Sequence, residues 1–191
     1  MQNFFLETVK KLSVAGISSP RLEARILFAY ILHEKPENII GNITLNSEQY
    51  NELQKLLQRR LAHEPLDKII GRREFYKYTF CTSNAVLSPR PDTEILVEEA
   101  LKIIHTDKNV CILDLGTGSG CIIETLLSER PAARGVAVDI SSAALQIAEQ
   151  NAANLNVADR LQFVEANWFA DNFTAQFLGK FDIIVTNPPY I

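Results

Sequence analysis

The stretch that decides the fold runs from residue 110 to residue 120 and reads Val-Cys-Ile-Leu-Asp-Leu-Gly-Thr-Gly-Ser-Gly. Residues 110–115 are an apolar segment of strand length, and they lead directly into three glycines that alternate with two small hydroxyl side chains. Residues 120–129 then continue with apolar side chains at helical spacing. This order predicts a strand, a glycine-rich turn and a helix whose N-terminus presents free N–H groups to a closely approaching ligand.

The same alternation continues toward the C-terminus. Residues 135–139, 161–165 and 181–186 predict three more strands, and residues 142–155 predict a helix between the first two of them. Repeated strand-helix-strand units favour a parallel sheet with right-handed crossovers. We therefore expect an α/β domain with about four strands over residues 91–191.

The first third of the chain has a different pattern. Residues 20–33 and 47–61 carry apolar side chains at helical spacing, and two serines before Pro20 are typical of a helix start. This pattern predicts a small all-α domain over residues 1–72. No candidate catalytic group stands out in it.

Aromatic and β-branched side chains mark the passage between the two domains. Residues 73–86 predict a pair of strands, and residues 88–92 (Ser-Pro-Arg-Pro-Asp) predict a stiff connector, because each proline fixes its own φ. A helix is expected from Asp92 to about residue 105. Residues 73–90 are thus predicted to be a β-hairpin and connector.

Composition indicates an ordinary globular protein. Of 191 residues, 47% are hydrophobic and 22% are charged, which is enough apolar material for a core. The net charge of −4 counts against a nucleic-acid coating protein. Cys81, Cys111 and Cys121 form no disulfide framework or metal motif, so reduced thiols and no metal site are expected. The chain shows neither a signal peptide nor a membrane span, which predicts a cytoplasmic protein.

The glycine-rich turn does not fit the common nucleotide motifs. The dinucleotide pattern G-x-G-x-x-G places its third glycine one position later than Gly120, and the lysine of a phosphate-binding P-loop is absent. Asp139 ends the second predicted strand, where a carboxylate accepts hydrogen bonds from both ribose hydroxyls of an adenosine. The alternative is that Asp139 caps the next helix. Trp168 either flanks an adenine or is a core residue.

The most specific signal is Asn187-Pro188-Pro189-Tyr190, directly after the fourth predicted strand. Consecutive prolines form a rigid bend at the edge of the sheet where α/β sites occur. The side-chain oxygen of Asn187 and the carbonyl of Pro188 can each accept one N–H of a planar NH₂ group, and Tyr190 can stack on it. The alternative is an ordinary turn.

Together these motifs resemble those of a class I S-adenosylmethionine-dependent methyltransferase that acts on an amino group. Gly-Arg-Arg-Glu-Phe at residues 71–75 and Leu-Ser-Pro-Arg-Pro-Asp-Thr-Glu at residues 87–94 resemble the HemK/PrmC family of release factor glutamine methyltransferases. The similarity covers essentially the whole chain. Ser88 departs from the family, in which an apolar residue is commoner.

The resemblance implies a Rossmann-like sheet, a function and a set of site residues. The chain would transfer the methyl group of S-adenosylmethionine to the glutamine of the Gly-Gly-Gln loop of release factors. The helical domain would bind the release factor. Because the family's catalytic domain continues past the Asn-Pro-Pro-Tyr motif, we expect this sheet to be incomplete. The implied cofactor residues are Asp114, Gly116, Thr117, Gly118, Ser119, Gly120, Asp139, Trp168 and Asn187. The implied substrate residues are Asn187, Pro188, Pro189 and Tyr190, with Asn187, Pro188 and Tyr190 catalytic.

Two other functions remain open at this point. An adenine amino-methyltransferase could use the same Asn-Pro-Pro-Tyr geometry to hold the NH₂ group of a flipped base in DNA or RNA. Arg59, Arg60, Arg72 and Arg73 would then form a phosphate-binding patch, although the acidic net charge counts against it. A chain without catalytic activity that only binds partners through its helical domain is the other possibility.

Overall fold

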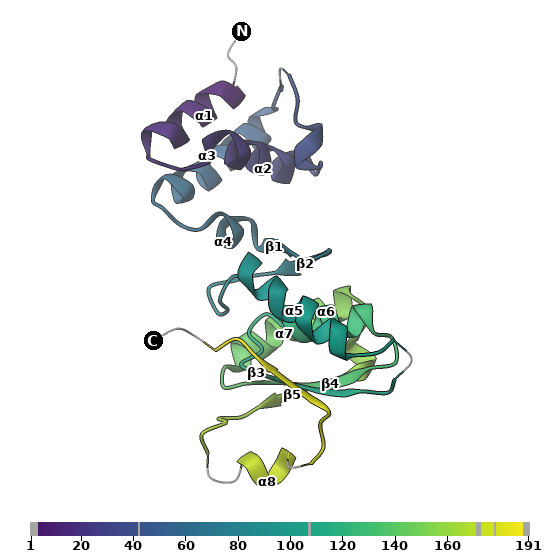
Figure 1. Ribbon diagram of the computed structural model, residues 1–191. Coiled ribbons are helices and arrows are strands. Elements are labelled where there is room, and N and C mark those ends of the chain that lie inside the picture. Colours follow the sequence, from purple (N-terminus) through teal and green to yellow (C-terminus); the bar gives the residue numbers. More distant parts are fainter. Residues whose placement is uncertain (1–3, 42, 107, 171–172, 178, 189–191) are drawn as a thin grey trace. The chain divides into compact units, whose positions relative to one another are not determined.

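The computed structural model describes residues 4–41, 43–106, 108–170, 173–177 and 179–188 (Figure 1). The chain divides into two compact units, Met1–Gly71 and Arg72–Ile191. The first is helical and the second is an α/β unit. The predicted fold class, a small all-α domain followed by a hairpin and a parallel sheet, is confirmed.

The helical unit is built around the buried faces of three longer helices. Its elements are α1 (Phe4–Val14), α2 (Pro20–Leu32), the 3₁₀ turn η1 (Pro36–Asn38), α3 (Ser47–Leu61) and α4 (Leu66–Ile70). Leu12, Leu27 and Leu53, one from each of these three helices, are fully buried together. Asn46 begins α3 with a capping box, since its side chain accepts the Gln49 N–H and the Gln49 side chain accepts the Asn46 N–H.

Two arginines of α3 are already paired with carboxylates of the same unit. Arg59 bonds Glu64 at 2.5 Å, and Arg60 bonds Glu23 of α2, also at 2.5 Å. A guanidinium held by a neighbouring carboxylate is a poor phosphate ligand, because its charge is compensated and its donors are used. Arg59 and Arg60 are therefore poor candidates for the phosphate-binding patch that a nucleic-acid substrate would need.

The α/β unit begins with an antiparallel hairpin and continues with a four-stranded parallel sheet. Its strands are β1 (Arg72–Phe75), β2 (Tyr78–Cys81), β3 (Cys111–Leu115), β4 (Arg134–Asp139), β5 (Leu161–Glu165) and β6 (Ile183–Thr186). Its helices are α5 (Pro91–Ile103), α6 (Cys121–Glu129), α7 (Ser142–Asn154), the 3₁₀ turn η2 (Ala158–Arg160) and α8 (Phe173–Phe177).

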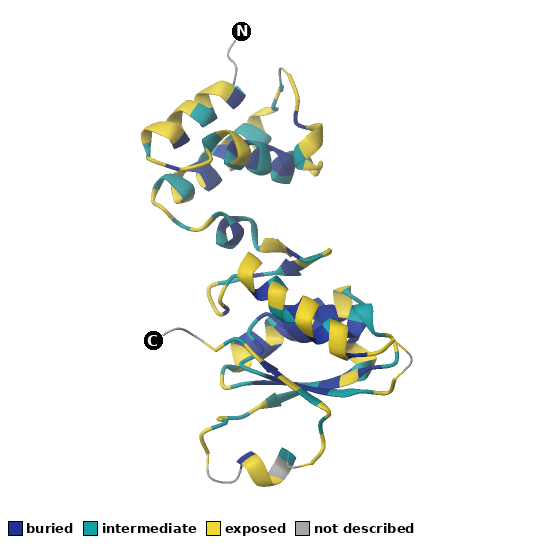
Figure 2. Ribbon diagram, viewed as in Figure 1, coloured by how far each residue is buried: buried dark blue, intermediate teal, exposed yellow. Residues whose placement is uncertain are grey.

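Successive residues of the central strands pack into two different layers, as the pleat of a β-strand requires. On β3, Ile112 belongs to the larger core under α5, α6 and α7, whereas Leu113 packs on the opposite face with Phe173 of α8. Figure 1 shows α5, α6 and α7 on one face of the sheet and α8 on the other. Figure 2 shows the buried residues concentrated on the sheet and on the sides of the helices that face it. Both faces of β3 are therefore covered.

The strand order, β5-β4-β3-β6, explains where a ligand would bind. The chain moves outward from β3 to β4 and β5, and then returns to the other side of β3 for β6. Right-handed crossovers place α6 and α7 on one face and the returning α8 on the other. The connections diverge between β3 and β6, and α/β sites form at the carboxyl end of such a switch point. The glycine-rich turn and Asn187 follow these two strands.

The hairpin is held against the helices by polar contacts. Asn151 of α7, only 1% exposed, accepts the Cys81 N–H at 2.7 Å and donates its amide N–H groups to the Cys81 carbonyl at 3.1 Å and the Ser119 carbonyl at 2.9 Å. One buried amide thus joins the hairpin to the glycine-rich turn.

The predicted elements need only small corrections. Strand β6 begins at Ile183 rather than at residue 181, and the hairpin strands end at Cys81 rather than near residue 86. The short helix α8 was not predicted, because five residues carry too little periodicity to distinguish a helix. Cys81, Cys111 and Cys121 are free thiols.

The described part of the chain contains neither a candidate membrane span nor a cluster of metal-binding side chains. Among these residues, no helix combines the length and apolar character that a membrane crossing requires. The same residues contain no group of three or more histidine, cysteine, aspartate or glutamate side chains that could hold a metal ion.

We predict that Asn151→Ala destabilises the α/β unit by about 2–4 kcal/mol, because backbone groups of Cys81 and Ser119 lose their partners in a buried place. Urea unfolding followed by circular dichroism measures this change. Gln146→Ala, an exposed change on the same helix, is the control and should cost less than about 0.5 kcal/mol. Equal effects of the two substitutions would contradict this role of Asn151.

Candidate active site

The turn after β3 is held against the end of β4 by its own backbone. The N–H groups of Gly116 and Thr117 both donate to the carbonyl of Val138, at 2.8 and 2.9 Å. Gly116, Gly118 and Gly120 all have φ between 56° and 79°, the left-handed region that side chains disfavour. The alternating glycines are therefore required by the path of the turn.

Asp139, the last residue of β4, connects this turn to the start of α7. Its Oδ2 accepts the Gly118 N–H and its Oδ1 accepts the Ser141 N–H, both at 2.9 Å. Ser141 is the N-cap of α7 and accepts the Ala144 N–H through its own hydroxyl. The interpretation of Asp139 as the helix cap is therefore wrong. Each carboxylate oxygen has a second lone pair, so these two bonds leave acceptor capacity for a ligand.

Trp168, shortly after β5, lies against the glycine-rich turn. A methyl group on the Cα of Gly116 would come within 3.1 Å of the indole ring, so Trp168 closes this side of the turn. The half-buried ring also packs on the apolar layer of Leu113 and Val138. The structure therefore places Trp168 beside the predicted cofactor site and at the edge of the core at once.

Asp114, Thr117 and Ser119 are buried beneath the turn. The Thr117 hydroxyl donates to Oδ2 of Asp114 at 2.8 Å, while Oδ1 of Asp114 is buried without a hydrogen-bond partner. Burial raises the pKa of Asp114 from its ordinary value of 3.8 to about 7, although the bond from Thr117 opposes this rise. These side chains support the turn from below, and the turn can face a ligand through its backbone.

Glu124 is a buried acid next to the glycine-rich turn that the sequence did not single out. It stands in the first turn of α6 and is fully buried, and neither of its carboxyl oxygens has a hydrogen-bond partner among the residues that the structure describes. Burial, and then the negative charge of Asp114, raise the pKa of Glu124 from 4.5 to about 10, so the carboxyl is neutral at pH 7. A methyl group at Gly120 would come within 1.8 Å of Oε1, so Gly120 gives Glu124 its space.

Asn187 follows β6 at the same edge of the sheet. It is half-buried, and its Nδ2 donates to the hydroxyl of Thr93 in α5 at 3.0 Å. This bond uses a donor of the amide, whereas the predicted contact with a substrate uses its oxygen. Pro188 is exposed. Pro189 and Tyr190, which were also predicted to bind the substrate, lie outside the described residues.

The residues around the turn fit an adenosyl cofactor. A methyl group at Gly118 would meet no atom of the described chain within 4 Å, so open space lies beside the carboxylate of Asp139. The indole of Trp168 lies against Gly116 of the same turn. A backbone that approaches closely, a carboxylate for ribose hydroxyls and an aromatic ring are the groups that such a ligand needs.

We predict that the stability of the protein falls as the pH rises from about 5 to 9. A carboxyl group whose pKa is raised on folding stabilises the folded state fully below its unfolded pKa, and this contribution is lost as the pH rises toward the folded value. For Glu124 this window lies between 4.5 and about 10, and the loss is up to about 1.4 kcal/mol per pH unit. Thermal unfolding at several pH values should show a flatter dependence for Glu124→Gln.

Glu129→Gln, also on α6, is the control for this experiment. Hydrogen bonds from Lys77 and Tyr78 hold the pKa of Glu129 below its ordinary value, with the Lys77 bond the stronger cause. Its contribution to stability is therefore lost on the acid side, and the slope above pH 5 should stay as in the unchanged protein. An unchanged slope in Glu124→Gln would refute the neutral, buried carboxyl.

Comparison with known proteins supports two domain assignments. Residues 77–191 match the model of the methyltransferase small domain, and residues 5–71 match that of the PrmC N-terminal domain. A bifunctional methyltransferase of Rickettsia felis is 42% identical over 95% of this chain and 39% of its own length. A release factor glutamine methyltransferase of Caulobacter vibrioides is 39% identical over 95% of this chain and 62% of its own length.

One solved structure supports the fold. A SAM-dependent methyltransferase of Agrobacterium tumefaciens superimposes with a TM-score of 0.50 and 19% identity, covering 62% of this chain and 39% of that one. This likeness concerns the fold alone. The chain thus belongs to the methyltransferase small domain family and carries a PrmC N-terminal domain before its α/β unit, which confirms the resemblance to the HemK/PrmC family.

Proposed function

We propose that this chain takes part in transferring the methyl group of S-adenosylmethionine to the side-chain amide nitrogen of a glutamine in the Gly-Gly-Gln loop of release factors. The observation that carries the proposal is the position of Asn187. It follows β6 at the switch point, next to the turn after β3, and its amide nitrogen is bound to Thr93. The amide oxygen is then the group offered to a substrate.

The cofactor would lie along the turn after β3. Asp139 would accept hydrogen bonds from the ribose hydroxyls, Trp168 would flank the adenine, and Gly118 would leave room for the backbone to approach. When bound, S-adenosylmethionine supplies an electrophilic methyl group on a positively charged sulfur. The network of Asp114 and Thr117 would keep the turn in its binding conformation.

The chain's own contribution to the reaction is positioning. An amide nitrogen is a poor nucleophile because its lone pair is delocalised into the carbonyl group. Asn187 Oδ1 and the Pro188 carbonyl would each accept one N–H of the substrate amide, which orients the nitrogen and favours the form with an available lone pair. No strong base is needed, because the proton leaves after the methyl group has been transferred. Pro189 and Tyr190 are proposed to complete this clamp.

The relatives support the choice of substrate. Besides the Caulobacter protein, a release factor glutamine methyltransferase of Rhodospirillum rubrum is 38% identical over 95% of this chain and 54% of its own length. The chain spans between about two fifths and two thirds of the length of such relatives. We extend their named activity and their release factor substrate to this chain, and we propose a cytoplasmic location for it.

One experiment distinguishes the possible functions. The chain is incubated with methyl-labelled S-adenosylmethionine together with a release factor and an adenine-containing DNA duplex, and the labelled product is identified by mass spectrometry. Label on the glutamine of the Gly-Gly-Gln peptide supports the proposal. Label on DNA would favour the adenine methyltransferase, and binding of the release factor without any label would favour a non-catalytic binding protein.

We predict that Asn187→Ala lowers the rate of glutamine methylation by at least about 100-fold, the effect of losing one preorganised polar contact at a reacting centre. Calorimetric affinity for S-adenosylhomocysteine measures the cofactor site separately. Asn154→Ala, an exposed change of the same kind, is the control. A turnover within threefold of the unchanged chain would exclude the amide clamp.

A further inference from the structure

The first turn of α5 contacts both the hairpin and the residue that follows β6. Pro91 begins α5, and Thr93 and Glu94 follow in its first turn. Thr93 is 7% exposed, and its hydroxyl accepts the Nδ2–H of Asn187 at 3.0 Å. Glu94 accepts the backbone N–H of Tyr76 in the hairpin, also at 3.0 Å. Two successive side chains thus tie the start of α5 to the hairpin and to the residue after β6.

Thr93 is well suited to hold another side chain in place. Its own backbone N–H donates to the carbonyl of Arg90 at 3.0 Å, and a β-branched side chain in a helix has few rotamers. Further along α5, Val97 and Ala100 are buried in the main core. The hydroxyl is therefore fixed relative to the sheet.

Asn187, in contrast, needs such a support. The terminal torsion of an asparagine is broad, so its amide can present either the nitrogen or the oxygen to a given side. The bond to Thr93 selects the orientation in which the nitrogen faces α5. The oxygen then faces away from α5, as the amide clamp requires.

We propose that Thr93 is the positioning residue that orients the amide of Asn187 for methyl transfer. This inference rests on the proposed function, because it assigns Thr93 a task in the same site. Thr93 itself does not touch the reacting atoms. Its hydroxyl lowers the barrier by keeping Asn187 Oδ1 in the acceptor position before the substrate arrives.

The test compares Thr93→Val, which keeps the shape but removes the hydroxyl, with Thr93→Ser, which keeps the hydroxyl. Thr8→Val in the helical unit is the control, since Thr8 is also buried and, among the described residues, its hydroxyl bonds only the Phe4 carbonyl of its own helix. The side-chain amide resonances of Asn187 are followed by NMR, and kcat and KM are measured with a release factor. Circular dichroism verifies that each variant is folded.

Thr93→Val should shift the Asn187 amide resonances and lower kcat at least about tenfold, with the KM for S-adenosylmethionine within about twofold. Thr93→Ser should restore most of the rate, and Thr8→Val should change neither quantity. Unchanged Asn187 resonances in Thr93→Val, or a kcat within twofold of the unchanged chain, would overturn the inference. If the unchanged chain methylates no release factor, the proposed function fails, whereas the NMR result still decides whether Thr93 holds Asn187.

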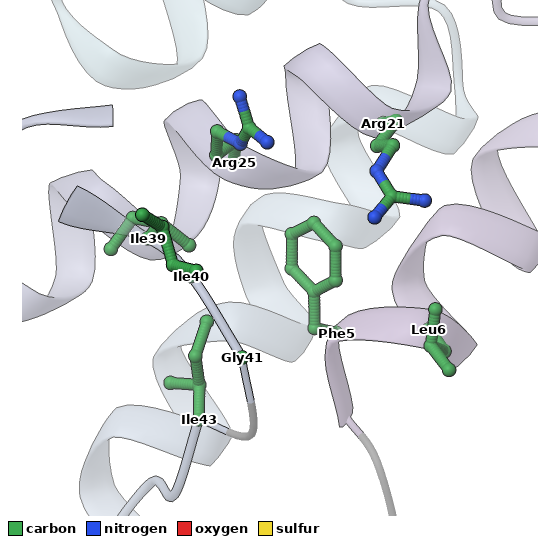
Figure 3. Close-up of a pocket in the computed structure, with 8 residues that line it drawn as sticks. All are labelled: Phe5, Leu6, Arg21, Arg25, Ile39, Ile40, Gly41 and Ile43. Atoms are coloured by element: carbon green, nitrogen blue, oxygen red, sulfur yellow. The ribbon is translucent and has the colours of Figure 1, made fainter. Parts of the chain in front are cut away.

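An independent observation concerns a cavity in the helical unit. It has a volume of about 410 Å³ and is lined by Phe5, Leu6, Arg21, Arg25, Ile39, Ile40, Gly41 and Ile43. Figure 3 shows the two arginine side chains of α2 on one side of the Phe5 ring and the isoleucines on another. Leu6 and Ile40 are 53% and 78% exposed, so the apolar lining continues onto the surface.

The two arginines of this cavity differ from those of α3. Arg59 and Arg60 are each paired with a glutamate, whereas Arg21 and Arg25 form no ion pair or hydrogen bond through their side chains with any described residue. The Nε of Arg25 is buried and has no hydrogen-bond partner within the described part of the chain. A buried guanidinium N–H without an acceptor is costly, and an incoming carboxylate would satisfy it.

We infer that this cavity binds an acidic, apolar segment of a protein partner, in which a carboxylate side chain stands next to an aliphatic or aromatic one. Arg21 and Arg25 lie one helical turn apart and would share the carboxylate. The isoleucines and Phe5 would cover the apolar neighbour. A protein segment is favoured over a small molecule, because the exposed Leu6 and Ile40 extend the apolar surface beyond the cavity.

The test titrates the whole chain with the peptide acetyl-Leu-Glu-Phe-amide and observes the Nε–H resonances of Arg21 and Arg25 by NMR. Acetyl-Leu-Gln-Phe-amide lacks the carboxylate, and hexanoate carries a carboxylate without a peptide. The double substitution Arg21→Gln with Arg25→Gln removes two charges from the cavity. Lys10→Gln with Lys11→Gln removes two charges from exposed positions of the same unit and is the matched control.

We expect saturable shifts with the glutamate peptide. Binding should be at least about tenfold weaker with the glutamine peptide or in the arginine variant, and it should be unchanged in the lysine variant. Equal binding of the two peptides would overturn the role of the carboxylate. Hexanoate binding as tightly as the glutamate peptide would overturn the protein segment in favour of a small carboxylate. Absence of shifts up to about 10 mM peptide would overturn the site.

Discussion

The register of the three parallel strands β4, β3 and β6 is the constraint on which the rest of the α/β unit depends. Leu115 of β3 stands opposite Val138 of β4 on one side and Thr186 of β6 on the other. The three strands therefore end at one height, and the residues that follow them meet there. A shift of one residue in either pairing would turn every side chain of a strand to the opposite face and separate the turn, Asp139 and Asn187.

The polar groups around this edge form two kinds of support. One kind is backbone-directed: Asp139 and Asn151 hold the turn and the hairpin through main-chain N–H and carbonyl groups. The other joins side chains, as in the pairs Asp114 with Thr117 and Asn187 with Thr93. The first kind determines where the backbone runs, and the second determines which atom of a side chain faces the ligand.

The sequence predicted the strands and long helices well, because apolar periodicity records which face of each element is buried. It also predicted that the glycine-rich turn, Asp139 and Asn187 lie at or just after the ends of strands, which is where the structure has them. It gave no sign of Thr93 and Asn151 as site residues, since their partners lie 94 and 70 positions away. Glu124 was visible as a single acid in an apolar run, but only its packing against Gly120 shows that it is buried without a partner.

The contact between Gly120 and Glu124 also constrains how this sequence can evolve. With the glutamate present, any side chain at position 120 would collide with its carboxyl, so the glycine is held in place by a second residue as well as by its φ of 79°. Replacing Glu124 by a smaller residue removes only the collision. The order of substitutions therefore matters: a side chain at position 120 meets less resistance after Glu124 has become smaller than before, when the glutamate carboxyl would have to move aside.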